Sequence, residues 1–215
     1  MLTFLLALHD SRQGRVWQQA LSGQGLWALQ GPAHSLAEAG RLALAQAPSL
    51  LVADLRLRDG NLIDLLRQLR SGRKGQVLPV LALVDDPADP LLLDLLQAGA
   101  NSFFMTASAS PGALADQALG VLAGEAHVPQ PMAQSLLSHF KACGTGYARS
   151  TLEDLSNPLS LDDVEWGLLC QLAVGERLGA LAGRAGQPPH LLMTRLRGIC
   201  RKMQWTQRAG NLQLA

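Results

Sequence analysis

Five short apolar runs, each of strand length, alternate with helical patterns over the first 125 residues of this 215-residue chain. The third run, Ser49–Asp54, has four consecutive apolar residues before it ends on a carboxylate, as expected of a strand buried on both faces. Strands alternating with helices predict a parallel sheet that right-handed crossovers make doubly wound. We therefore expect an α/β flavodoxin-like fold with strand order 2-1-3-4-5. The expected strands are Leu2–Leu8, Leu26–Leu29, Ser49–Asp54, Val77–Val84 and Ser102–Met105.

The last third of the chain shows a second pattern, in which apolar residues recur with helical spacing. From Leu192 to Met203 they follow i, i+4, i+7, i+11, which predicts an amphipathic helix from about Pro189 to Met203. A Gly-containing break separates this helix from a shorter one before it, the arrangement of a helix-turn-helix. The polar side of the longer helix is basic and carries Arg195, Arg197, Arg201 and Lys202.

Three motifs in this region resemble the DNA-binding domain of LuxR/NarL-type response regulators. They are an acidic helix start at Leu161–Glu165, a scaffold-helix motif at Leu178–Ala182 and a basic helix end at Leu196–Met203. The resemblance extends over about 55 residues without a gap and implies an all-α, four-helix domain whose last helix reads the major groove of double-stranded DNA. It implies DNA contacts by Arg195 and Arg197 in the groove, by Thr194, and by Arg201 and Lys202 at backbone phosphates.

Two positions depart from the family pattern. Pro188–Pro189 stand where the family usually has Ser and a polar residue at the start of the reading helix; the lost hydroxyl cap costs about 1 kcal/mol. Met193 stands where the family often has a Lys that reaches DNA. We therefore expect weaker or differently specific binding. The alternative for the basic face is an ordinary solvated helix surface.

The segment around Asp54 resembles the phosphoacceptor region of receiver domains. It reads LLVADLRLRDGNLIDLLRQLR, and the turns at Ala98–Ala100 and Ala123–Glu125 also fit, so the resemblance spans about residues 1–125. In that family the Asp attacks a phosphohistidine and becomes an aspartyl phosphate.

Most side chains that assist the receiver reaction are replaced in this chain. The family's two adjacent Mg²⁺-binding acids correspond to Leu8 and His9, with Asp10 one place late. Its phosphoryl-contacting Ser/Thr corresponds to Val84 and its Lys to Thr106, whereas Phe103 retains the switch-aromatic position. We favour Asp54 as a strand-end carboxylate that caps its own loop, with ordinary Mg²⁺-dependent phosphorylation as the alternative.

The length and amino-acid composition are those of a folded two-domain chain, with 48% hydrophobic and 16% charged residues. We expect a receiver-like domain at 1–125, a linker with a helix and solvent-facing His127 and His139 at 126–157, and a helix-turn-helix domain at 158–215. From Gln187 onward there are five Lys/Arg and no acid, so nucleic-acid affinity is expected there. The three cysteines form neither a metal spacing nor a disulfide framework, and no signal peptide or membrane span is recognisable.

These features predict a cytoplasmic, sequence-specific DNA-binding transcriptional regulator that acts as a homodimer without a metal or other cofactor. The residues from Leu91 to Leu122 are expected to supply the dimer face. The alternative is a signalling interaction module in which the receiver-like domain binds a regulatory protein and the helix-turn-helix has lost strong DNA binding. An enzyme is the least expected class, because the sequence has no nucleophile–base pair of a known type.

Overall fold

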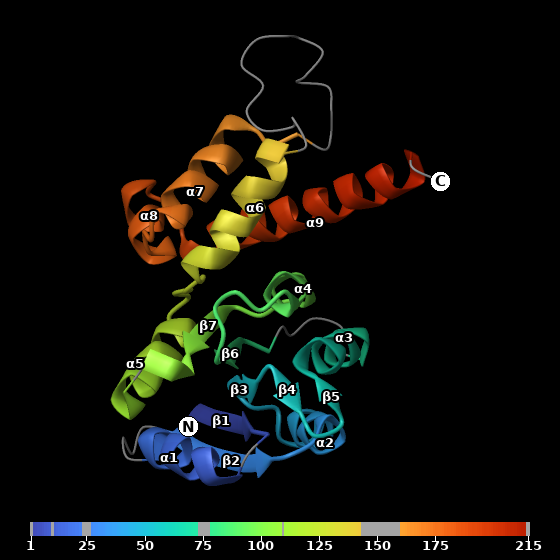
Figure 1. Cartoon of the computed structure of the whole chain (residues 1–215). Coiled ribbons are helices and arrows are strands. Elements are labelled where there is room, and N and C mark those ends of the chain that lie inside the picture. Colours follow the sequence, from blue (N-terminus) through green and yellow to red (C-terminus); the bar gives the residue numbers. More distant parts are fainter. Residues whose placement is uncertain are drawn as a thin grey trace. The chain divides into compact units, whose positions relative to one another are not determined.

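The computed structural model describes residues 2–9, 11–22, 27–72, 78–108, 110–142 and 160–213. The chain divides into two compact units, Met1–Glu125 and Ala126–Ala215 (Figure 1). The boundary expected between residues 157 and 158 lies outside the described residues, as does Asp10.

The first unit is built on a parallel five-stranded sheet. Its strand order is β2-β1-β3-β6-β7, which is the predicted 2-1-3-4-5 order once a small two-stranded ribbon after β3 is set aside. All neighbouring strands in the sheet pair in parallel. The sheet strands are β1 Leu2–Ala7, β2 Trp27–Ala33, β3 Leu50–Asp54, β6 Val80–Val84 and β7 Ser102–Met105, and the ribbon is β4 Arg56–Leu57 with β5 Gly60–Asn61.

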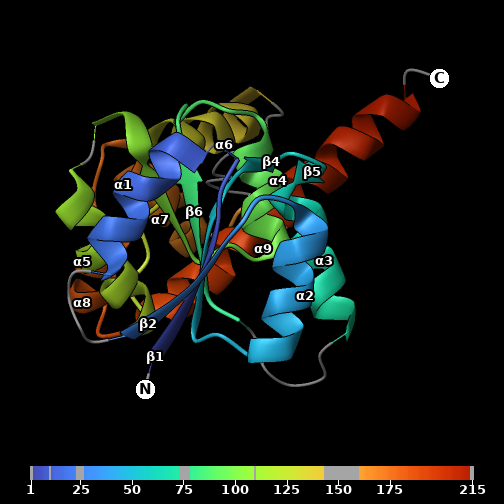
Figure 2. The ribbon, with the colours of Figure 1, turned by 90° about the horizontal axis from the view of Figure 1, so that it is seen from below.

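Helices cover both faces of this sheet, as expected for strands that are apolar on both sides. Figure 2 shows α1 and α5 on one side of the sheet and α2 and α3 on the other. The face under α1 and α5 is a single apolar cluster in which Trp17 packs edge-on against Phe104, with ring centroids 5.6 Å apart. The helices of this unit are α1 Ser11–Ser22, α2 Leu36–Gln46, α3 Leu62–Gly72, α4 Leu91–Ala98, α5 Pro111–Leu122 and the 3₁₀ turn η1 Thr106–Ser108.

The second unit consists of helices in its described part (Figure 1). The predicted apolar stripe of the last helix is its buried face: Leu196 and Ile199 are fully buried, and Leu192 and Met203 nearly so. The helices are α6 Gln130–Ala142, α7 Asp163–Ala173, α8 Leu178–Arg184 and α9 Pro189–Gln213.

Helix α6, expected in the linker, is part of the second unit and packs against α7 and α9. Its buried residues Met132, Leu136 and Phe140 form an i, i+4, i+8 stripe that needs a partner to exclude water. The side-chain amides of Gln130 and Gln134 donate to the carbonyl of Ala173 at 2.8 and 3.1 Å, which satisfies an acceptor at the end of α7. Three helices of the 158–215 region therefore combine with α6 to make the four-helix arrangement.

The two histidines expected to face solvent are partly buried instead. Burial, followed by the positive charge of Arg177, lowers the pKa of His127. His139 lies 2.6 Å from the hydroxyl of Thr206, Nε2 to Oγ1, and burial lowers its pKa as well. Helix α9 also extends ten residues beyond the predicted end at Met203, to Gln213. His127 lies shortly before α6 and His139 lies within it, so the docking of this helix buries part of both side chains.

Candidate nucleic-acid interface

The α8–α9 corner has the geometry of a helix-turn-helix. Helix α8 ends at Arg184, and Gly186 adopts a left-handed conformation (φ 61°) that a residue with a Cβ rarely takes. The backbone N–H of Gln187 donates to the carbonyl of Ala182 at 3.0 Å, closing the end of α8. Helix α9 then begins at Pro189, where the missing N–H has no helical partner to lose.

The start of α7 is fixed by a reciprocal capping box. The Asp162 carboxylate accepts from the backbone N–H of Glu165 at 2.7 Å, and the Glu165 carboxylate accepts from that of Asp162 at 3.0 Å. A cap of this kind stabilises a helix by about 1 kcal/mol. It also holds the Glu165 side chain in a defined place at the edge of the unit.

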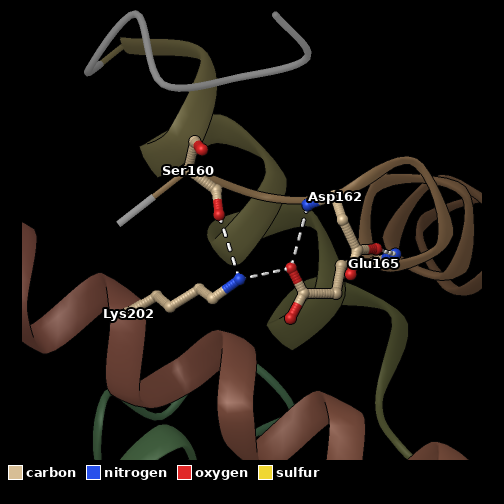
Figure 3. A network of polar contacts seen from close by, with 4 residues as sticks. All are labelled: Ser160, Asp162, Glu165 and Lys202. Carbon is tan, nitrogen blue, oxygen red and sulfur yellow. Dashed lines mark hydrogen bonds and ion pairs between the residues drawn. The ribbon is translucent and has the colours of Figure 1, made fainter. Parts of the chain in front are cut away.

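Lys202 of α9 binds to this capped carboxylate (Figure 3). Its Nζ lies 2.6 Å from Glu165 Oε2 and donates to the backbone carbonyl of Ser160 at 3.0 Å. The two side chains are only 22% and 10% exposed. The ammonium expected to contact DNA phosphate is thus engaged within the unit, where it ties the reading helix to the start of α7.

The other predicted DNA contacts lie away from the buried stripe of α9. Thr194 and Arg201 are exposed, and Arg195 and Arg197 are half-buried. The Thr194 hydroxyl donates its proton to the carbonyl of His190 at 2.9 Å. Its oxygen therefore remains able to accept a hydrogen bond from a ligand. Met193, at the position where the family often has Lys, is 3% exposed and belongs to the core. The structure brings these polar residues onto one helix but leaves Met193 unable to reach a ligand.

Glu165 is the residue of this site that the sequence interpretation missed. The spacing Asp162-x-x-Glu165 before an apolar helix is a capping-box signature and was available in the sequence. Its pairing with Lys202, 37 residues away, was not, because it depends on how α9 docks on α7.

In the first unit, Asp54 stands at the carboxyl end of β3 and its carboxylate accepts a bond from the backbone N–H of His9, 2.7 Å from Oδ2. The neighbouring replacements Leu8 and Val84 are each 1% exposed and belong to the core. Mg²⁺ prefers an octahedral set of oxygen ligands. Leu8 and Val84, which the resemblance aligns with oxygen-bearing residues of a receiver, have no oxygen in their side chains to offer such an ion.

Thr106, which the resemblance aligns with the receiver Lys, binds the end of the neighbouring strand β6. Its hydroxyl contacts the carbonyl of Val84 at 3.2 Å and forms a short hydrogen bond to the Asp85 carboxylate. Phe103, at the switch-aromatic position, is fully buried in β7. The groups at this edge of the sheet therefore satisfy one another.

The described ranges contain no group of three or more His, Cys, Asp or Glu side chains placed to hold a metal ion. None of their helices is long and apolar enough to cross a membrane.

No protein-family model matches the sequence, and no curated protein matches it significantly. Solved structures do resemble it. The RcsB response regulator of Salmonella typhimurium, whose structure concerns DNA interaction, is 14% identical with a TM-score of 0.54 over 94% of this chain and 92% of that one. A LuxR-family response regulator from an Aurantimonas species is 21% identical with a TM-score of 0.54 over 60% of this chain and 91% of that one.

A third similar structure is a LuxR-family DNA-binding response regulator from Staphylococcus aureus, 11% identical with a TM-score of 0.52 over 57% of this chain and 99% of that one. Identities this low establish the fold alone. The similarity to response regulators inferred from the motifs is thereby confirmed for the architecture. The chain has the fold of a LuxR-type response regulator, a receiver-like five-stranded unit followed by a helical unit.

Proposed function

We propose that this protein is a sequence-specific, DNA-binding transcriptional regulator whose receiver-like unit is not switched by Mg²⁺-dependent aspartyl phosphorylation. The observation that carries the proposal is the division of α9 into two sides. One side is buried from Leu192 to Met203, and the remaining surface carries Arg195, Arg197 and Arg201 in a segment without a single acid from Gln187 onward. A basic helix of this kind suits the negative potential of the major groove.

The arginines of α9 are the proposed DNA contacts, together with Thr194. Arg201 is exposed, and Arg195 and Arg197 have part of their side chains in solvent. Lys202 is proposed to act differently, by positioning α9 through Glu165 rather than by contacting phosphate. This revision rests on the 2.6 Å ion pair and on the low exposure of both partners.

The proposed loss of phosphorylation rests on the edge of the sheet around Asp54. Receiver chemistry requires a divalent cation and positive charge at the phosphoryl oxygens. Leu8, Val84 and Thr106 supply neither, and the Asp54 carboxylate already accepts the N–H of His9. The unit is proposed instead to serve in assembly or to bind a regulatory protein.

A homodimer is proposed because a single helix-turn-helix covers one half-site, and paired half-sites require two copies. The face from Leu91 to Leu122 offers less apolar surface than its sequence suggests: Leu92, Leu95 and Leu96 are buried in their own core, and Leu91 and Leu93 partly so. Sedimentation of the untreated protein at micromolar concentration, with and without DNA, tests the dimer. A monomer that binds one half-site would contradict it. Such a regulator would act in the cytoplasm, where its DNA is.

The deciding experiment is a selection from random duplex DNA with the full-length protein, followed by footprinting and titration at several salt concentrations. A sequence that is enriched, footprinted and bound saturably at moderate salt is the expected result. Only weak binding that salt abolishes would favour the interaction module, for which the buried Met193 and the Pro188–Pro189 start of α9 are the supporting observations.

A further inference from the structure

Of Arg195, Arg197 and Arg201, only Arg201 lies on the outer face of α9. Positions in an α-helix advance by about 100° each, so residues two apart lie on opposite flanks. Arg195 and Arg197 are two apart, and both are half-buried, as flank residues should be. They cannot both point at the floor of one groove.

The centre of the outer face, opposite the buried stripe that runs through Leu196 and Ile199, is formed by Thr194, Gly198 and Arg201. Leu191 lies beside this line, in the first turn of α9 and one turn before Arg195. Leu191 is 43% exposed although it is apolar. A Cβ built on Gly198 would meet no atom within 4 Å, so the backbone there is open to close approach.

We propose, on the basis of the DNA-binding function above, that Leu191 is a specificity-determining residue that reads the C5-methyl group of a thymine, while Arg195 and Arg197 hold the phosphates on either side of the groove. The N-terminal residues of a recognition helix meet base edges, and Leu191 is in the first turn of α9. DNA is the occupant that fits this surface, because the apolar residue is flanked by positive charge and no acid occurs from Gln187 onward.

Leucine prefers thymine because its side chain has no hydrogen-bonding group. Its side chain has no donor or acceptor, and the thymine methyl is the one apolar group that an unmodified base pair presents in the major groove. Against guanine or cytosine the same side chain would cover hydrogen-bonding atoms without replacing their water, which costs affinity. Leu191 therefore favours thymine by contacting its methyl group and disfavours the bases whose hydrogen-bonding atoms it would cover.

The test uses the duplex enriched by the full-length protein, with each thymine in turn replaced by deoxyuridine, which lacks only the methyl. At one thymine in each half-site, the replacement should weaken wild-type binding about fourfold, the ~0.8 kcal/mol of one buried methyl group. Leu191→Ala should bind the thymine duplex about fourfold more weakly and no longer distinguish it from the deoxyuridine duplex. Leu44→Ala, which removes an exposed leucine from α2 in the first unit, is the matched control and should behave as wild type.

The outcomes distinguish a failure of the proposed thymine contact of Leu191 from a failure of the proposed DNA binding. A footprinted duplex at which every deoxyuridine substitution affects wild type and Leu191→Ala equally overturns the role of Leu191 and leaves DNA binding intact. The same holds if Leu191→Ala abolishes self-association while its base preference is unchanged, since the surface would then face a second copy. Failure to enrich any sequence overturns both proposals. Because each variant is compared with itself on two duplexes, a change in folded fraction cannot imitate the expected coupling.

Discussion

The strand edge around Asp54 and the outer side of α9 are the two candidate sites of this molecule, and they differ in how their polar groups are used. At the strand edge, Asp54 accepts from the backbone of His9, and Thr106 bonds to Val84 and Asp85. On α9, Arg201 and Thr194 face solvent. In the first region the polar groups bond to one another and to the backbone, and in the second Arg201 and Thr194 are exposed.

The difference shows that this fold does not depend on polar side chains at Leu8 and Val84. The sheet is held by alternating side chains packed on both faces, and Leu8 and Val84 have simply joined that core where a receiver would have oxygens. On α9 the core side and the polar side are separate residues, so either can change without the other. A change at the strand edge should thus leave the fold and α9 intact.

The largest expected effect is on DNA binding by α9. Arg195→Ala and Arg201→Ala should each weaken binding to the selected duplex by about 1–3 kcal/mol and lower the slope of log affinity against log salt by about one. Titration by fluorescence anisotropy at several salt concentrations measures both. Arg41→Ala, an exposed arginine on α2 of the first unit, is the control and should have no effect. Unchanged affinity in both α9 variants would remove this helix as the DNA reader.

A somewhat smaller effect is expected when the Lys202–Glu165 pair is broken. Lys202→Met leaves the Glu165 carboxylate, only 10% exposed, without its cation, and should cost the second unit about 2 kcal/mol. Faster hydrogen exchange in α7 and α9, measured by mass spectrometry, reports this loss locally. The double variant Glu165→Gln with Lys202→Met should recover part of it. A reduced salt slope of DNA binding with unchanged exchange would instead make Lys202 a phosphate contact.

In the first unit, Thr106→Val should cost about 1 kcal/mol, because it removes the hydroxyl that joins β7 to the end of β6. Hydrogen exchange should rise in β7 and in the segment after Val84, and DNA affinity should stay the same. A change in DNA affinity would show that the strand edge still communicates with α9, and would break the contrast between the two regions.

The two units should also respond differently to acid. Burial and the charge of Arg177 lower the pKa of His127 below its ordinary value of 6.5. The unfolded chain therefore takes up the proton first, so this contribution to stability is complete above pH 6.5 and declines as pH falls toward the folded pKa. His127→Gln should flatten that decline in the second unit, measured by hydrogen exchange between pH 7.5 and pH 5.

In the first unit, Asp59 is a group whose pKa is lowered by folding. Backbone N–H bonds, first that of Leu36, lower the pKa of Asp59 below its ordinary value of 3.8. Its contribution is present above pH 3.8 and is lost only as pH falls further, toward the folded pKa. Equal loss of protection in both units between pH 6.5 and pH 5 would contradict this assignment.

Asp54→Ala should change neither the DNA affinity nor the assembly of the protein. Incubation of the wild type with acetyl phosphate and Mg²⁺ should likewise leave the intact mass and the sedimentation coefficient unchanged, because the charge-stabilising groups of a receiver are replaced. Stoichiometric addition of a phosphoryl group to Asp54 with a change in assembly would make this a working phospho-switch and would remove the contrast between the two regions.

The sequence by itself determined the features that repeat along the chain. Apolar runs alternating with helical patterns predicted the parallel sheet and its strand order, and the stripe from Leu192 to Met203 predicted the buried side of α9. The strand order came from the doubly wound fold class that the alternation indicates. The buried side of α9 follows from local periodicity, since the side of a strand or helix on which a residue lies depends only on its neighbours. The same rule would have placed Arg195 and Arg197 on opposite flanks.

The tertiary structure alone decided which groups meet across long separations. His9 and Asp54 are 45 residues apart, and Glu165 and Lys202 are 37 apart. Helix α6 looked like a linker because its apolar stripe has no partner until α7 and α9 are folded beside it. Such pairings depend on how whole elements dock, and a charge such as that of Lys202 has no assigned partner until the surfaces around it are packed.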